Sequence, residues 1–389
     1  MRRADFLAAS AAALSLASAM AAPARAASAI RIGTLPPGAN DAITDVAGVL
    51  VGHVTKIEGA AGPLVAGKGP VRTGVTAIVP NADVWMRRVA AATYDLNGNG
   101  ELTGAHWVDE SGFLETPIAF TNTLSVPRVD DGVLDWMIRR WPAIGVSDDV
   151  PLPVVAECDD QGLNDIQGRH VSASDAVRAL DAAATGQIQR GNVGAGTGMR
   201  AFGFKGGIGS ASRRVSADAN AATVGVLLNA NTGSRTELRI DGVPVGRLTA
   251  RELLPVFPPR TSYVEHGRAA DGSIVGAIAT DAPLDARQLR QLCKRAVLGL
   301  ARTGITSHVS SGDLLVAFST TRLYPREGAP LPVPAVYDDR QLDALFSATA
   351  EAAEAAVVDA LLSARTLSGA RGITFYALPE ARVRELLKQ

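Results

Sequence analysis

Several features that mark common protein classes are scarce in this chain of 389 residues. Its two cysteines are too few for a disulfide framework in a chain of this length. Its 38 basic and 39 acidic residues are scattered, which argues against nucleic acid as a partner. Beyond residue 26, no hydrophobic run approaches the roughly 20 residues of a membrane span. Because 47% of the residues are hydrophobic, the sequence predicts a globular protein with a large core.

Familiar catalytic and metal-binding motifs are missing as well. The sequence contains no G-x-S-x-G nucleophile elbow and no H-E-x-x-H, and its five histidines lie far apart. Asp95 to Gly100 opens like an EF-hand loop, but the twelfth position is His106 where calcium needs a bidentate glutamate. We therefore interpret residues 95–100 as a Gly- and Asn-rich turn, and we predict neither a metal nor a cofactor.

The N-terminus has the composition of an export signal. Two arginines at positions 2 and 3 precede a mildly apolar, Ala- and Ser-rich stretch that ends in Ala24-Arg25-Ala26. We expect cleavage after Ala26 and a periplasmic or secreted protein. The paired arginines resemble a twin-arginine signal, with an ordinary secretory signal as the alternative. Residues 27–389 then form a single catalytic domain.

The mature chain alternates between strand-like and helix-like segments. Strands are predicted over 42–54, 74–79, 153–160, 224–231 and 314–319 and from Ser273 onward, a hairpin over 238–245, and helices over 172–184, 285–301 and 340–364. Cys293 falls on the apolar stripe of the second helix, which favours a buried free thiol over a bridge to Cys158. This alternation indicates an α/β fold with layers of helices and strands.

Ser273 is the residue with the most distinctive position. It begins an apolar strand-like run and follows Gly272. If the bond between the two were cut, the freed α-amine of the serine would lie beside its own hydroxyl and titrate near neutral pH, so it could accept the hydroxyl proton. Glycine suits such a bond, because a residue without Cβ tolerates strained conformations. Gly-Ser before an apolar run is common, however, so this pattern alone is weak evidence.

A set of motifs in a fixed order gives this serine more weight. The chain resembles the family of L-aminopeptidase D-amidase/D-esterases and β-peptidyl aminopeptidases over almost the whole mature sequence. The segments that carry the resemblance include ITDV at 43–46, NGNGE at 97–101, TNTLSV at 121–126, GLNDI at 162–166, GAGTGM at 194–199, GFKGGIG at 203–209, DGSI at 271–274, ATDAPL at 279–284 and SGD at 311–313.

The resemblance implies a fold and a processing event. The fold is a four-layer α/β/β/α sandwich that resembles the N-terminal-nucleophile hydrolases but differs in strand connectivity. The chain would cleave itself between Gly272 and Ser273 into residues 27–272 and 273–389. The product would be a serine aminopeptidase that releases N-terminal residues from peptides, amides or esters through an acyl-enzyme. The same resemblance suggests a homo-oligomer, a tetramer of such chain pairs.

Site residues follow from the same motifs. By resemblance, Ser273 is the nucleophile, Ser311 and Asp313 polarise it, and Asn231 donates to the oxyanion. Glu157 would hold the free ammonium of the substrate, and Asn122 would also contact the substrate. One departure stands out: Asp159 occupies the position of a tyrosine whose hydroxyl assists the oxyanion in some relatives, and an ionised carboxylate cannot donate.

Two other functions remain open on the sequence. Acyltransferases of the arginine pathway share the layered fold and the self-cleavage, but they use threonine as nucleophile and are not exported. An inactive periplasmic binding or scaffold protein is the second alternative, and Asp159 is its best support. The preferred configuration of the substrate residue, α-L, D or β, depends on the shape of the pocket and is left open.

Overall fold

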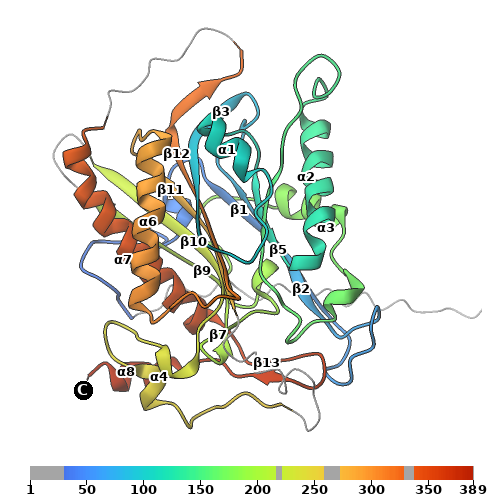
Figure 1. Ribbon diagram of the computed structural model, residues 1–389, viewed down its shortest axis with the longest axis vertical. Coiled ribbons are helices and arrows are strands. Elements are labelled where there is room, and N and C mark those ends of the chain that lie inside the picture. Colours follow the sequence, from blue (N-terminus) through green and yellow to red (C-terminus); the bar gives the residue numbers. More distant parts are fainter. Residues whose placement is uncertain (1–29, 216–220, 258–271, 328–336, 389) are drawn as a thin grey trace, which may run out of the picture.

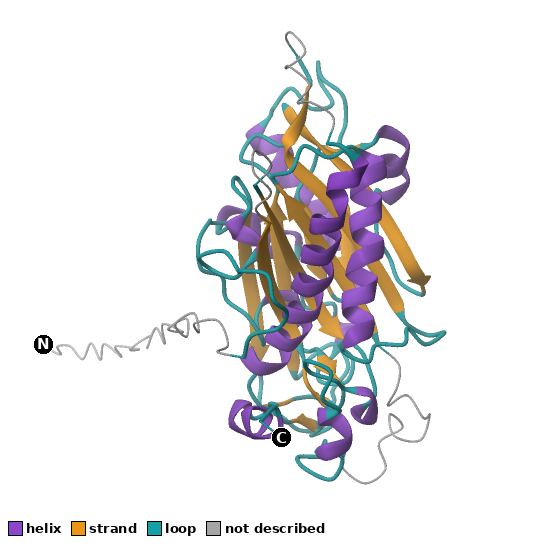
Figure 2. Cartoon of the chain, turned by 90° about the vertical axis from the view of Figure 1, so that its left-hand side faces the viewer, coloured by secondary structure: helices purple, strands orange, loops and turns teal. Residues whose placement is uncertain are grey.

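The computed structural model describes residues 30–215, 221–257, 272–327 and 337–388. The proposed export signal and Asp271 lie outside the described residues. Within the described ranges, no helix is long and apolar enough to cross a membrane. Figures 1 and 2 show two long helices lying against a large sheet, and Figure 1 shows a second helical layer on the far side of the strands.

Two sheets form the centre of the molecule. The smaller sheet has the order β1-β2-β5-β6 and the larger the order β4-β3-β12-β11-β10-β9. Their bounds are Leu50–Glu58 for β1, Val71–Val79 for β2, Ile118–Thr121 for β5, Val154–Glu157 for β6, Phe113–Leu114 for β4, Arg87–Gly98 for β3, Gly312–Pro325 for β12, Ser273–Thr280 for β11, Ala222–Asn231 for β10 and Gly207–Val215 for β9. Two short pairs complete the strands: Arg200–Ala201 (β7) with Phe204–Lys205 (β8), and Leu367–Ser368 (β13) with Thr374–Phe375 (β14).

Helices cover the outer face of each sheet. Val126–Arg140 (α2) and Ala173–Asp181 (α3) pack on the smaller sheet, whereas Ala286–Arg302 (α6) and Leu342–Ser363 (α7) pack on the larger one. The shorter helices are Ala105–Ser111 (α1), Val245–Leu248 (α4) and Glu380–Leu386 (α8). A third apolar cluster lies between the sheets and joins side chains of both. The four-layer α/β/β/α sandwich is thereby confirmed.

Strand β11 lies in the middle of the larger sheet and is buried along its whole length. Val275, Ala277 and Ala279 face the smaller sheet, while Ile274 and Ile278 face α6 and α7. Both faces are therefore apolar, which explains a continuous hydrophobic run instead of an alternating one. The strand pairs antiparallel with β10 and parallel with β12.

Three local predictions were wrong in detail. Residues 43–45 form a 3-10 helix before β1, because the Asp45 carboxylate accepts hydrogen bonds from the backbone N–H groups of Asn40 and Ala42. Residues 95–98 belong to β3, since they pair with β12. The segment 238–245 makes only the single bridge between Ile240 and Val243, because α4 begins at once at Val245. Both cysteines are free and buried, as predicted.

Candidate active site

Ser273 is the first residue of β11 and lies between two strand ends. Its register partners are Asn231, the last residue of β10, and Gly312, the first residue of β12. Ser273 is buried, with 8% of its surface exposed. The backbone N–H of Gly312 donates to Ser273 Oγ at 3.2 Å. The sheet therefore holds Ser273 between the ends of β10 and β12, and β12 supplies a donor to its hydroxyl.

Ser311 and Asp313 lie on either side of Gly312. Ser311 Oγ donates to Asp313 Oδ1 at 2.8 Å, and both residues are buried. Burial raises the pKa of Asp313, and the hydrogen bond from Ser311 acts in the opposite direction. The structure thus places the predicted hydroxyl–carboxylate pair on either side of Gly312, the residue whose N–H contacts Ser273 Oγ. Such a pair can orient a proton acceptor beside Ser273, as the third member of a catalytic triad does.

The side-chain amide of Asn231 is held at both ends. Its Oδ1 accepts from the backbone N–H of Arg200 at 3.0 Å, and its Nδ2 donates to the backbone carbonyl of Asp159 at 2.9 Å. These two contacts fix which end of the amide carries the hydrogens. An amide nitrogen has two hydrogens, so the second can serve an oxyanion that develops near Ser273.

Glu157 ends β6 and is 4% exposed. Its carboxylate accepts from Thr123 Oγ1, and from the backbone N–H of Glu101 at 3.2 Å. Burial raises the pKa of Glu157, and these two hydrogen bonds act in the opposite direction. A buried carboxylate that keeps part of its acceptor capacity is suited to bind an ammonium group.

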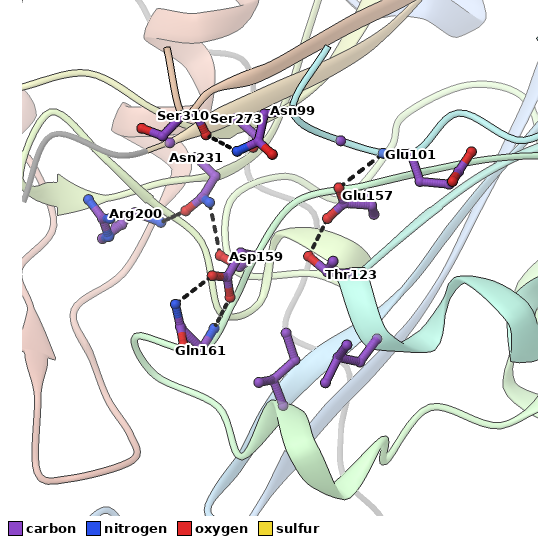
Figure 3. A pocket seen from close by; sticks show the side chains of 14 residues that line it. Asn99, Glu101, Thr123, Glu157, Asp159, Gln161, Arg200, Asn231, Ser273 and Ser310 are labelled. Atoms are coloured by element: carbon purple, nitrogen blue, oxygen red, sulfur yellow. Dashed lines mark hydrogen bonds between the residues drawn. The ribbon is translucent and has the colours of Figure 1, made fainter. Parts of the chain in front are cut away.

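Ser273, Asn231 and Glu157 meet at a cavity of about 500 Å³, whereas Ser311 and Asp313 are not among its described lining residues. Figure 3 shows Glu157 and Thr123 on one side, Ser273 and Asn231 in the middle, and Arg200 on the other side. The described lining residues are Asn99, Gly100, Glu101, Thr123, Leu124, Glu157, Asp159, Gln161, Ile166, Arg200, Asn231, Gly272, Ser273 and Ser310. Four predicted residues, Glu157, Asn231, Gly272 and Ser273, are among them.

Asn122, which was predicted to contact the substrate, lies in the interior instead of at the cavity. Its Nδ2 donates to Thr73 Oγ1 at 2.8 Å in the buried interior, and it is not among the described residues that line the cavity. Its neighbour Thr123 lines the cavity instead and contacts Glu157. Thr123 belongs to the same motif at 121–126, so the motif indicated the correct segment without indicating which side chain points into the cavity.

Three more lining residues were given no role in the site from the sequence, although Asn99 belongs to the motif at 97–101. Asn99 Nδ2 donates to the backbone carbonyl of Ser310 at 2.6 Å and so ties the end of β3 to the segment before β12. Gln161 donates to the Asp159 carboxylate through both its backbone N–H and its Nε2, each at 2.7 Å. Arg200 lies between the two glycine-rich motifs at 194–199 and 203–209, and neither motif includes it. Among the described residues, no group of His, Cys, Asp or Glu has the arrangement of a metal site.

Comparison with known proteins places this geometry in a family. A family model described as Peptidase family S58 matches residues 41–375. The chain belongs to this family. The β-peptidyl aminopeptidase BapA of Sphingosinicella microcystinivorans is 44% identical over 359 residues, which are 91% of this chain and 89% of that relative. Members of family S58 are peptidases, so the chain is a hydrolase, and its similarity to BapA makes it an aminopeptidase.

Solved structures agree with this assignment. A Burkholderia β-aminopeptidase is 42% identical with a TM-score of 0.80, covering 92% of this chain and 96% of that one. The L-aminopeptidase D-Ala-esterase/amidase of Ochrobactrum anthropi is 38% identical with a TM-score of 0.81, again over 92% of this chain and 96% of that one. That protein is described as a prototype of the serine aminopeptidases and a new variant of the Ntn hydrolase fold. The acyltransferase alternative is not favoured by these relatives.

Proposed function

We propose that this family S58 aminopeptidase activates itself by cutting the bond between Gly272 and Ser273. The position of Ser273 carries the proposal: the residue begins a central strand between Asn231 and Gly312, and its hydroxyl accepts a hydrogen bond from the N–H of Gly312. In the uncut chain, Oγ attacks the Gly272 carbonyl and the peptide nitrogen leaves as the α-amine. Water then hydrolyses the resulting ester and frees the hydroxyl.

The same atoms serve the turnover of substrates. The ammonium of a peptide, amide or ester with a free N-terminus binds Glu157, and Ser273 Oγ attacks the first carbonyl. The proton of Oγ passes to the freed α-amine of Ser273, whose ordinary pKa of about 7.7 to 8.0 suits a base near neutral pH. Asn231 donates to the oxyanion. Expulsion of the leaving amine gives an acyl-enzyme, which water hydrolyses.

The class of N-terminal residue is proposed from the relatives. The printed names of the similar proteins include β-peptidyl, L-amino and D-alanyl activities. We therefore expect activity on at least one of β-, α-L- and D-aminoacyl p-nitroanilides. An export signal over 1–26, which would be removed after Ala26, and a homo-oligomer of chain pairs complete the proposal.

Processing and turnover can be tested together. Purified protein is analysed on a denaturing gel, by intact mass and by N-terminal sequencing, and is then assayed on the three p-nitroanilides. We expect two chains, the second beginning at Ser273, and hydrolysis of one or more substrates. Ser273→Ala should stay a single chain without activity, whereas Ser147→Ala, a change at an exposed serine, should behave like the wild type. An intact chain that hydrolyses the substrates would contradict self-activation.

A further inference from the structure

One peptide group links Ser273 to the end of β3. It joins Ser311 to Gly312, and its N–H donates to Ser273 Oγ at 3.2 Å. Its carbonyl oxygen, on Ser311, accepts a hydrogen bond from Asn97 Nδ2 at 2.5 Å. Hydrogen bonds in such a chain polarise one another, so a donor to the carbonyl strengthens the N–H at the other end. A chain of two hydrogen bonds therefore leads from the Asn97 side chain to the hydroxyl of Ser273.

The side chain of Asn97 is fixed by two carbonyls. Asn97 lies near the end of β3, opposite Asp313 in the register of β3 and β12. Its Nδ2 donates to the carbonyl of His308 at 2.8 Å in addition to that of Ser311. Both hydrogens of the amide nitrogen are thereby used, and the two carbonyl acceptors determine which end of the amide faces them. The His308 carbonyl also accepts from the backbone N–H of Ser311 at 2.8 Å, so one turn carries both acceptors.

The segment after Asn97 passes close to the same peptide group. The backbone N–H of Asn99 donates to the Ser311 carbonyl at 3.3 Å. A Cβ on Gly312 would lie 2.5 Å from the Asn99 carbonyl oxygen, so the two backbones are in direct contact here. Figure 3 shows Asn99 next to Ser273, and both residues line the cavity. The motif that begins at Asn97 therefore packs on the motif around Gly312, although the two are far apart in the sequence.

We propose that Asn97 is a positioning residue for Ser273, because it holds the peptide group whose N–H faces Oγ. This inference rests on the proposed function, which makes Ser273 the nucleophile. Negative charge develops on Oγ as its proton leaves during attack, and an N–H that is already in place stabilises this charge without rearrangement. Self-cleavage and substrate hydrolysis both begin with attack by Oγ. Asn97 therefore accelerates both reactions, although it is not among the described residues that line the cavity.

The test compares Asn97→Ala with Asn192→Ala. Asn192, which is not among the described lining residues of the cavity, makes contacts of the same kind. Its Nδ2 donates to the carbonyl of Arg365 at 2.8 Å, and its Oδ1 accepts from the backbone N–H of Arg365 at 3.0 Å. On the p-nitroanilide that the processed wild type hydrolyses best, Asn97→Ala should lower kcat about 10- to 100-fold. The KM should stay within about twofold, because Glu157 is unchanged. Asn192→Ala should keep the kcat and KM of the wild type.

The reactivity of Ser273 can also be measured without a substrate. Phenylmethanesulfonyl fluoride sulfonylates an activated serine with loss of fluoride, and it has no ammonium that needs Glu157. Its rate of reaction with Ser273, followed by peptide mass spectrometry, should fall in Asn97→Ala by about the same factor as kcat. Asn97→Asp keeps the shape of the side chain but turns an acceptor towards two carbonyls, so it should react at least as slowly. Asn192→Ala should react at the rate of the wild type.

Three results would overturn the inference: an unchanged kcat and labelling rate in Asn97→Ala, equal losses in Asn192→Ala, or wild-type rates in Asn97→Asp. If Asn97→Ala is not cut, both alanine changes are made in the Ser273→Ala chain and compared by urea unfolding. Equal midpoints attribute the loss of cleavage to a less reactive serine and support the inference, whereas a lower midpoint for Asn97→Ala attributes it to folding and overturns the inference. Full activity of Ser273→Ala would remove the proposed function as well. An enzyme that depends on Ser273 but is indifferent to Asn97 leaves the proposed function standing.

Discussion

A side chain at Gly272 would collide with the backbone of Asn231. A Cβ built on the glycine lies 2.4 Å from the Asn231 carbonyl oxygen and 2.5 Å from the Cα of Thr232. Contacts this short with backbone atoms cannot be relieved by a change of rotamer, so the chain would have to shift at the proposed cleavage site. The residue before the proposed nucleophile is therefore constrained by the end of β10, the strand that also carries Asn231, the proposed oxyanion donor.

Gly272→Ala should slow self-cleavage by about 10-fold or more, because the backbone shift that relieves the clash moves the carbonyl that Ser273 Oγ must attack. A time course of freshly purified protein on denaturing gels measures the fraction cut. Gly62→Ala is the matched control, since a Cβ at Gly62 would meet no atom within 4 Å. Cleavage of the Gly272 variant at the rate of the control would show that the close approach to Asn231 has no part in processing.

The ionisation of Asp313 should affect how kcat falls at low pH. Burial raises its pKa, so the carboxylate is protonated at a higher pH than an ordinary aspartate, whose pKa is about 3.9. Because the freed α-amine of Ser273 must also be unprotonated, the kcat of the processed enzyme should fall in two steps as pH decreases, one for the amine and one for Asp313. Asp313→Asn should lower kcat by about 100-fold or more and remove the step that belongs to Asp313, while the step of the amine remains. The exposed Asp343→Asn should keep the wild-type profile.

The raised pKa of Asp313 affects stability in the opposite way to activity: the ionised carboxylate supports kcat but lowers the free energy of unfolding. A raised pKa means that the folded state favours protonated Asp313, so its stabilising contribution is present at low pH and is lost as pH rises through the folded pKa. At neutral pH the ionised group therefore destabilises the fold. Asp313→Asn, made in the uncleaved Ser273→Ala chain, should not lower the free energy of unfolding in urea at pH 7. A loss of more than about 1 kcal/mol would show that the carboxylate is needed for folding.

Local sequence signals predicted the elements that hold the site. The helix expected at 285–301 is α6, and its Asp285 cap accepts the backbone N–H of Gln288 at 2.8 Å. The strand expected from Ser273 is β11, because burial on both faces leaves a continuous apolar run. Composition and spacing alone did not yield the four layers, which came from the family resemblance.

The residues that sequence reasoning missed depend on contacts between distant segments. Thr123 reaches the carboxylate of Glu157 from another part of the chain, and Arg200 meets Asn231 across 31 positions. Neither contact leaves a local pattern. The hairpin predicted at 238–245 failed for a local reason: Asp241-Gly242 does form a tight turn, but Pro244 and Val245 start α4 before a second strand can pair. Proline is well tolerated at the start of a helix, so the turn signal was correct and the strand signal was not.

Glu157 should determine the affinity for substrates with a free N-terminus. Glu157→Gln removes the negative charge and keeps one oxygen, which can still accept from the backbone N–H of Glu101, while the new amide nitrogen can donate to Thr123 Oγ1. A hydrogen bond to a charged group contributes about 1.5 to 3 kcal/mol, so kcat/KM should fall about 10- to 100-fold, mainly through KM. Steady-state kinetics on an aminoacyl p-nitroanilide measure the change, with the exposed Glu110→Gln as control. An unchanged KM would place the substrate ammonium elsewhere.

Lys205 should support both stability and catalysis. Lys205→Met leaves three buried carbonyls without their donor, which should cost about 3 to 5 kcal/mol in the free energy of unfolding. Urea unfolding in the Ser273→Ala background measures this loss, and the exposed Lys68→Met should cost less than about 0.5 kcal/mol.

The catalytic effect of Lys205 should pass through Asn231, because the β7–β8 hairpin carries the N–H of Arg200 that holds the amide. Lys205→Met should therefore lower kcat in the wild type but change it little in Asn231→Ala. Equal losses in both backgrounds would show that the lysine acts on folding alone.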